Sequence, residues 1–287
     1  MKLFQPAKFR KVNFLIIGTQ KGGTSALDHY LRQHPDVGMP GKKELHFFDN
    51  EKKFSKGRTD YKFYESRFRL LGKKRVFGEA TPIYMYWEPA IRRIWEYNPE
   101  IKLIAILRNP AERAFSQWNM ETSRKWEKKD FMFCIRNETE RSRKALPLQH
   151  RVYSYIDRGY YSEQIRRLYR YFPKEQLLFV KYDDFVSSQE ATLKSIFRFL
   201  GIDSAAFRFD PREVHQRPYL RKMTLEERLF LREIYLNDIR EVERLLGWDC
   251  SEWIPKNVPA KDQAIILPQF TDSSLLAMPG VRRFAMK

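Results

Sequence analysis

Short apolar runs alternate with amphipathic segments along the first two thirds of the chain. The runs are rich in β-branched and aromatic residues, have the length of buried strands, and lie at 12–17, 75–78, 102–107 and 176–180. Between them, apolar side chains recur at helical spacing over 26–31, 89–97 and 164–171. Alternating strands and helices predict a parallel sheet with right-handed crossovers. We therefore expect a three-layer α/β fold with a central parallel sheet flanked by helices.

The remainder of the chain is less regular. Residues 125–151 are highly charged and have no sustained period, so we expect an irregular insertion over the sheet edge. Residues 224–246 predict a long helix, with Thr224 as its N-cap and a glycine at its end. We expect a single domain over 1–254 and an extended or poorly ordered tail over 255–287, where prolines recur without periodicity.

Composition excludes several classes of protein. With 43% hydrophobic and 31% charged residues, the 287-residue chain is neither disordered nor fibrous. Its longest apolar runs fall far short of the roughly 20 residues that cross a bilayer. Residues 1–13 lack the apolar stretch of a signal peptide, so we expect a cytoplasmic protein. Cys134 and Cys250 lie far apart in the chain, which predicts two reduced thiols.

The charge balance points to an anionic partner. Lys and Arg number 54 against 36 Asp and Glu, which gives a formal net charge of +18. Such a field concentrates nucleic acid, phosphorylated nucleotides, acidic polysaccharides and anionic lipids alike. A basic nucleic-acid-binding protein is therefore one hypothesis for this chain.

The loop after the first strand has the features of an anion-binding site. Residues 18–25 read GTQKGGTS and lead into a helix. Glycines let backbone N–H groups approach an anion, and the helix N-terminus adds partial positive charge. Lys21 supplies a full charge, and two hydroxyl side chains follow it. The residues expected to bind a phosphate or sulfate are Lys21, Gly22, Gly23, Thr24 and Ser25.

The loop differs from the P-loop of nucleoside triphosphatases. That motif, G-x-x-x-x-G-K-[ST], would place lysine at the position of Thr24. The strand over 102–107 is followed by Arg108, where a magnesium-binding carboxylate would be expected. Both departures favour a second anion held directly by the protein. A magnesium-dependent nucleotide kinase is the alternative enzyme.

These motifs resemble the sulfotransferases that use 3′-phosphoadenosine 5′-phosphosulfate (PAPS), above all the heparan-sulfate-type branch and its bacterial relatives. Loop 18–25 is similar to their 5′-phosphosulfate loop. Residues 107–116, LRNPAERAFS, are similar to their 3′-phosphate motif, in which Arg108 and Ser116 would grip that phosphate. Further motifs follow in the expected order at 34–37, 43–49 and 158–161. The resemblance implies a P-loop-like fold, PAPS as co-substrate and no metal.

The chemistry of sulfuryl transfer suits these residues. In-line transfer to a hydroxyl or amine builds negative charge on the bridging oxygen, which Lys21 and Thr24 would stabilise. The resemblance makes Glu44 the general base, and its apolar neighbours could raise its pKa from about 4.3. The alternative is that Glu44 simply pairs with a lysine before it. His46 is an alternative base or a donor that orients the acceptor, and a merely structural role is equally open for it.

Other residues are assigned more weakly by the resemblance. Tyr160 is expected near the nucleotide, and a loop before the long helix could close over the phosphates or be solvated. The basic residues of that loop are Arg217, Arg221 and Lys222.

The chain also departs from the family. The branch commonly has a lysine where this chain has Ala80, and the Golgi anchor and paired cysteines of the animal enzymes are missing. These departures imply a cytoplasmic bacterial enzyme or one that modifies a small natural product. The acceptor is expected to be a small molecule or saccharide, and a basic wall suits an anionic one. Residues 125–151 and the segment after Phe207 are expected to bind it. We expect no nucleic-acid or membrane partner.

Overall fold

The computed structural model describes residues 11–55, 57, 59–69, 71–210 and 218–254. The chain divides into two compact units, of which one runs to Arg108 and again from Glu163 to Pro218. The other comprises Asn109–Ser162 and the chain from Tyr219 onward. The single domain over 1–254 stays a prediction, and the expected tail, 255–287, lies outside the described residues.

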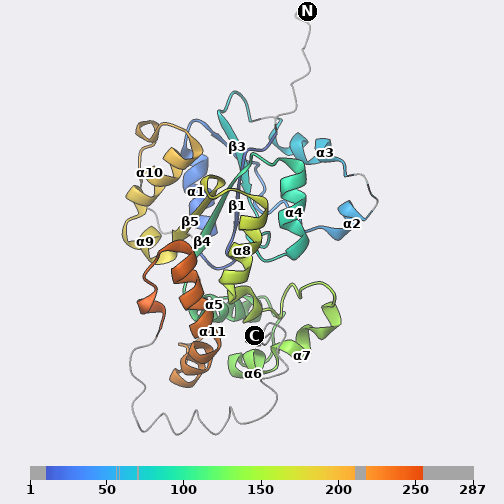
Figure 1. Ribbon diagram of the computed structural model, residues 1–287, viewed down its shortest axis with the longest axis vertical. Coiled ribbons are helices and arrows are strands. Elements are labelled where there is room, and N and C mark those ends of the chain that lie inside the picture. Colours follow the sequence, from blue (N-terminus) through green and yellow to red (C-terminus); the bar gives the residue numbers. More distant parts are fainter. Residues whose placement is uncertain (1–10, 56, 58, 70, 211–217, 255–287) are drawn as a thin grey trace, which may run out of the picture. The chain divides into compact units, whose positions relative to one another are not determined.

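The first unit is built on a parallel sheet of five strands (Figure 1). The strands are β1 (Phe14–Gly18), β2 (Val37–Gly38), β3 (Val76–Ala80), β4 (Lys102–Leu107) and β5 (Leu177–Lys181). Their order is β2-β3-β1-β4-β5, and every neighbouring pair is parallel. The sheet and four of its strands confirm the prediction. β2 was not predicted, because a strand of two residues is too short to show a period.

Helices cover both faces of this sheet. They are α1 (Thr24–Gln33), α2 (Glu51–Phe54), α3 (Tyr61–Glu65), α4 (Glu88–Tyr97), α9 (Tyr182–Ser187), α10 (Gln189–Leu200) and, from Glu163 onward, α8 (Tyr161–Tyr171). Figure 1 shows α1, α9 and α10 on one side and α4 and α8 on the other. On the first side, Phe14 and Ile16 form a core with Leu27 of α1 and Phe197 of α10. Successive strand residues point to opposite faces, so the buried Leu15 belongs to the second side.

The second unit is helical. Its helices are α5 (Pro110–Ser123), α6 (Phe131–Arg136), α7 (Glu138–Ser142) and α11 (Leu225–Leu246), together with the first residues of α8. The α11 boundaries confirm the prediction: Thr224 and Glu227 form a capping box, and Gly247 ends the helix with a φ of 67°. Among the described helices, none combines the length and apolarity needed to cross a membrane.

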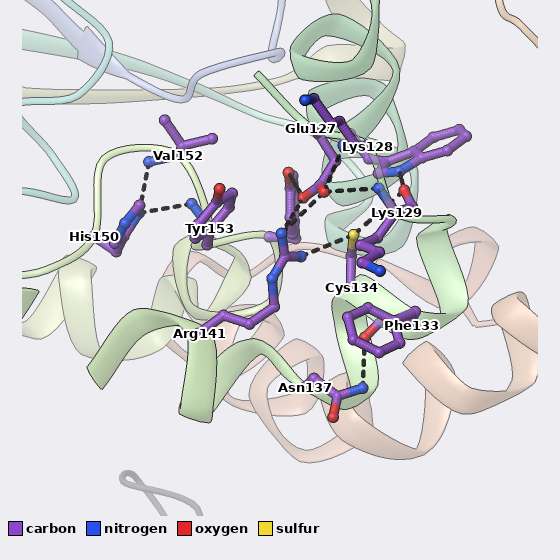
Figure 2. Close-up of polar contacts among 12 residues, drawn as sticks. Glu127, Lys128, Lys129, Phe133, Cys134, Asn137, Arg141, His150, Val152 and Tyr153 are labelled. Atoms are coloured by element: carbon purple, nitrogen blue, oxygen red, sulfur yellow. Dashed lines mark hydrogen bonds and ion pairs between the residues drawn. The ribbon is translucent and has the colours of Figure 1, made fainter. Parts of the chain in front are cut away.

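The predicted irregular insertion over 125–151 is wrong in one respect, because it contains α6 and α7. Both helices are too short to show a period, and they surround a buried ion pair (Figure 2). Glu127 meets Arg141 at 2.7 Å, with side-chain exposures of 1% and 16%. The Tyr155 hydroxyl donates to the same carboxylate at 2.9 Å, and the guanidinium also contacts Cys134. The segment is organised by this polar centre rather than by apolar periodicity.

Replacing Arg141 tests the contribution of this centre. Arg141→Met leaves the buried Glu127 carboxylate without its cation, so we expect unfolding free energy to fall by about 3 kcal/mol in urea denaturation. The matched control is Arg143→Met, whose partner Glu140 lies 3.2 Å away on the surface. The control should change stability by less than about 0.5 kcal/mol. Equal losses from both variants would contradict a structural role for the buried pair.

Candidate functional site

Three strands of the first unit end at one edge of the sheet. β1 lies between β3 and β4, and all three run in the same direction. The chain leaves β1 toward β2 and β3 on one side, and β4 and β5 lie on the other. Ligands of open α/β sheets bind outside the carboxyl ends of the strands at such a switch point. The loop after Gly18 starts at this edge of the sheet, and Arg108 is the first residue after β4 at the same edge.

The loop after β1 is fastened to β4 through its backbone. The N–H and hydroxyl of Thr19 both donate to the Ile106 carbonyl at 2.9 Å. The Gly22 N–H donates to the Thr19 carbonyl at 2.9 Å. A Cβ at Gly22 would lie 2.5 Å from the Ile106 carbonyl oxygen. This close approach of two backbones explains why glycine occupies the position.

The loop then enters α1 with the geometry of an anion site. Gly23 is the N-cap of α1 in the left-handed region, with a φ of 92°. Lys21 also has a positive φ of 71°. Thr24 and Ser25 begin the helix, so their N–H groups lack partners within it. The fixed backbone, the helix N-terminus and the lysine together suit an anion such as phosphate or sulfate.

The side chain of Arg108 contacts this loop, while its predicted role in binding an anion stays a prediction. Its Nη1 donates to the Lys21 carbonyl at 3.4 Å. Its guanidinium lies 4.9 Å from the ring centroid of Tyr182. The same ring borders Gly23, where a Cβ would lie 3.2 Å from it. Sequence reasoning missed Tyr182 because only its contacts, and no motif, mark it.

Glu44 and His46 lie on a segment bound to the end of β3. The Glu44 N–H donates to the Ala80 carbonyl at 3.1 Å. The Glu44 carboxylate contacts Lys43 Nζ at 2.9 Å and His46 Nε2 at 3.5 Å. On its other side, His46 Nδ1 lies 2.9 Å from Asp49 Oδ2. Asp49 was not predicted, although the Glu-x-His-x-x-Asp spacing could have indicated it.

The charge state of this segment corrects one expectation. Burial acts to raise the pKa of Glu44, but hydrogen bonds and charge from His46 and Lys43 outweigh it and lower the pKa to about 2. The expected upward shift was therefore wrong. Hydrogen bonds to Asp49 and Glu44 raise the pKa of His46 to about 9. At neutral pH, Glu44 is ionised and His46 is protonated.

Ser116 and Tyr160 belong to the second unit. Ser116 is buried on α5. Tyr160 packs edge-on against Tyr235, with ring centroids 5.6 Å apart. The preceding Gly159 leaves no room for a side chain, because a Cβ there would collide with the Tyr235 hydroxyl. The roles of Ser116 and Tyr160 at the nucleotide stay predictions.

Arg221 and Lys222, of the basic loop before α11, also belong to the second unit. Arg221 forms an ion pair with Glu227 at 2.5 Å and lies 4.9 Å from the ring centroid of Trp118. Lys222 is exposed, and Arg217 lies outside the described residues. Closure of this loop over phosphates stays a prediction. In the described ranges, no three His, Cys, Asp or Glu side chains are grouped as metal ligands.

A substitution at Gly22 tests the backbone approach. Gly22→Ala places a methyl group against the Ile106 carbonyl, so we expect unfolding free energy to fall by about 1–3 kcal/mol in urea denaturation. The control is Gly41→Ala, since a Cβ at Gly41 meets no atom within 4 Å. An unchanged free energy of unfolding in Gly22→Ala would contradict a tight contact between the loop and Ile106.

The titration of His46 tests the electrostatics. The pKa of His46 in the folded protein, about 9, exceeds the ordinary 6.5, so protonated His46 stabilises the fold. This contribution to the free energy of unfolding is complete below pH 6.5 and is lost as pH rises through about 9. NMR of the imidazole protons should follow this titration directly. Asp49→Asn should lower the midpoint, whereas Asp36→Asn, remote in sequence and paired with Arg75, should not. A midpoint near 6.5 in the unmodified protein would contradict the geometry.

Comparisons with known proteins indicate a family for this chain. A family model described as "Sulfotransferase domain" matches residues 11–227. Heparan sulfate glucosamine 3-O-sulfotransferase 3B1 of Mus musculus is 35% identical over 188 residues, covering 66% of this chain and 45% of that protein. Heparan sulfate glucosamine 3-O-sulfotransferase 6 of Homo sapiens is 32% identical over 203 residues, covering 69% and 54%. The chain thus spans about half the length of these curated relatives.

Solved structures share the fold. A sulfotransferase from Alicyclobacillus acidocaldarius superposes with a TM-score of 0.73 and 28% identity, covering 85% of this chain and 99% of that chain. A mouse sulfotransferase complexed with PAP has a TM-score of 0.53 and 17% identity, covering 84% and 90%, which shows the fold alone. The family match extends over more than half of the sequence and includes both predicted anion-binding segments. The chain therefore belongs to the sulfotransferase-domain family.

Proposed function

We propose that this chain transfers a sulfuryl group from PAPS to a hydroxyl or amine of a saccharide or small-molecule acceptor. One observation carries the proposal: Arg108 Nη1 donates to the carbonyl of Lys21, so both anion-binding segments meet at one sheet edge. A nucleotide with phosphates at both ends of its ribose needs two such segments. The relative solved with PAP and the relatives named for heparan sulfate support this assignment.

The residues present fit the donor. Gly22 lets the loop pack against the Ile106 carbonyl, which fixes the backbone of the loop that would bind the phosphosulfate. Lys21 and the first N–H groups of α1 would bind that group. The planar fork of Arg108 suits the 3′-phosphate better than a lysine would. Ser116, eight residues further along, would add a hydroxyl.

The transfer step needs charge stabilisation at one oxygen. The acceptor oxygen or nitrogen bonds to sulfur as the bond from sulfur to the bridging phosphate oxygen breaks, and PAP is released. Lys21 would stabilise the charge that grows on the bridging oxygen, and Thr24 would add a hydrogen bond. Because attack is in line with the breaking bond, the acceptor would lie on the side of the sulfur opposite the loop that carries Lys21.

The acceptor proton is assigned to Glu44. Its carboxylate is ionised at neutral pH and can accept the hydrogen bond of an incoming hydroxyl. A pKa of about 2 makes it a weak base, so the proton moves only as S–O bond formation makes the hydroxyl acidic. His46, with a pKa of about 9, holds its proton at neutral pH and suits the role of a donor. These values favour Glu44 over His46 as the base.

The acceptor is proposed only by class. The net charge of +18 suits an anionic saccharide or metabolite. Residues 125–151 and the segment after Phe207 stay the predicted acceptor-binding loops. The cytoplasmic location and the expected lack of nucleic-acid and membrane partners also stay predictions.

Calorimetric titration with PAP in the presence of EDTA tests the donor site. We expect Lys21→Ala and Arg108→Ala each to weaken binding roughly 10- to 100-fold, since each removes a charge-assisted hydrogen bond. Lys52→Ala and Arg92→Ala, two changes at solvent-exposed positions, are the matched controls and should bind PAP normally.

The same variants separate the competing functions. Binding of ATP only with magnesium would favour the kinase. Salt-steep affinity for DNA that survives loss of Lys21 and Arg108, with no affinity for PAP, would favour the nucleic-acid-binding protein. Incubation with radiolabelled PAPS and heparan sulfate, glucosamine or p-nitrophenol then tests transfer itself. Absence of PAP binding would refute the proposal.

A further inference from the structure

A buried carboxylate lies beneath the segment that carries Glu44. Glu79, on β3, is 1% exposed and has no part in the proposed reaction. The Thr81 hydroxyl donates to its Oε2 at 2.6 Å, and the Tyr84 hydroxyl donates to its Oε1 at 2.8 Å. The Tyr64 hydroxyl approaches the same Oε1 at 3.4 Å. Burial raises the pKa of this carboxyl to about 7, because the core solvates its charged form poorly.

The Glu79 carboxylate is joined to the backbone of the Glu44 segment through Tyr84. The Phe47 N–H donates to the Tyr84 hydroxyl at 2.9 Å, and that hydroxyl in turn donates to Glu79. Since a hydroxyl has one proton, the Tyr84 hydroxyl relays between these two groups in a fixed direction.

Two residues of this segment have unusual backbone angles. Glu44 has a φ of 61° and His46 has a φ of 49°. Residues other than glycine rarely adopt this region, and they persist in it only where the surrounding structure holds them. The N–H of Glu44 donates to the Ala80 carbonyl, and the N–H of Phe47, which follows His46, donates to Tyr84. Hydrogen bonds therefore hold the segment at both ends of the strained pair.

We propose that Glu79 and Tyr84 are positioning residues that hold the backbone of residues 44–47 in the conformation in which the Glu44 carboxylate meets His46. The inference rests on the proposed role of Glu44 as general base. A carboxylate suits this position because its three hydroxyl partners can all donate. An amide would turn its NH₂ group toward one of these donors.

Two tyrosines provide a matched test. Tyr64 and Tyr84 are both fully buried, and both hydroxyls lie at Glu79 Oε1. Only the Tyr84 hydroxyl accepts a hydrogen bond from the segment, at Phe47. Tyr84→Phe should therefore displace Glu44, and Tyr64→Phe should not. A purely structural role would make the two variants alike, apart from their stability.

The readouts are turnover, donor affinity and the His46 titration. Turnover is measured as PAP release from PAPS with heparan sulfate as the probe acceptor. In Tyr84→Phe we expect kcat to fall roughly 10- to 100-fold, with PAP affinity within about twofold of normal. In this variant His46 loses its contact with Glu44, so its titration midpoint should fall below the value of about 9 in the unmodified protein. Tyr64→Phe should leave kcat and this midpoint near those of the unmodified protein.

A second variant and a reference variant keep the outcomes distinct. Glu79→Gln preserves side-chain volume, and we expect it to lower kcat and the His46 midpoint as Tyr84→Phe does. Equal kcat and equal midpoints in Tyr84→Phe and Tyr64→Phe would overturn the inference. Glu44→Gln is the reference: if it retains full turnover, the proposed base is wrong, whatever the tyrosine variants do. The His46 titration needs no acceptor and so tests the positioning even if heparan sulfate is not sulfated.

Discussion

The carbonyl of Ile106 is the contact on which the candidate site depends. It accepts hydrogen bonds from both the N–H and the hydroxyl of Thr19. It also lies so close to Gly22 that no side chain fits between that residue and the carbonyl. Ile106 lies in β4, two residues before Arg108, which follows the strand. One backbone group therefore fixes the anion-binding loop relative to the strand that delivers the arginine. Rigid strands position such groups more reproducibly than loops alone can.

The same sheet edge brings a third segment into the site. Residue Glu44 is bound to the end of β3, which neighbours β1 as β4 does on the other side. Its carboxylate lies between two cations, Lys43 and His46. This environment keeps the carboxylate ionised in a protein whose overall charge attracts anions. Neutralising neighbours of this kind reduce the repulsion between a carboxylate and any anion bound near it.

The sequence allowed prediction of features that local patterns determine. The strand over 102–107 was recognisable from its apolar run, and α11 from its capping residues and terminal glycine. The turn from β1 into α1 was recognisable because its glycines have a direct physical meaning before a helix. Contacts between distant residues were not predictable: Tyr182 beneath Arg108, and Tyr84 between Glu79 and Phe47, depend on the assembled fold. The pKa of Glu44 was predicted in the wrong direction because its apolar neighbours in sequence are outweighed by two cations in space.

The polar centre at Glu127 and Arg141 has a consequence for how this part of the chain can vary. Neither α6 nor α7 is long enough to persist in water without tertiary contacts. Both helices therefore depend on tertiary contacts, among them this ion pair and the packing of Phe131 against Phe115 and Trp118. Exposed positions of the segment take no part in these contacts. Substitutions are therefore expected to be better tolerated on the exterior of the segment than at the acidic and basic side chains inside it.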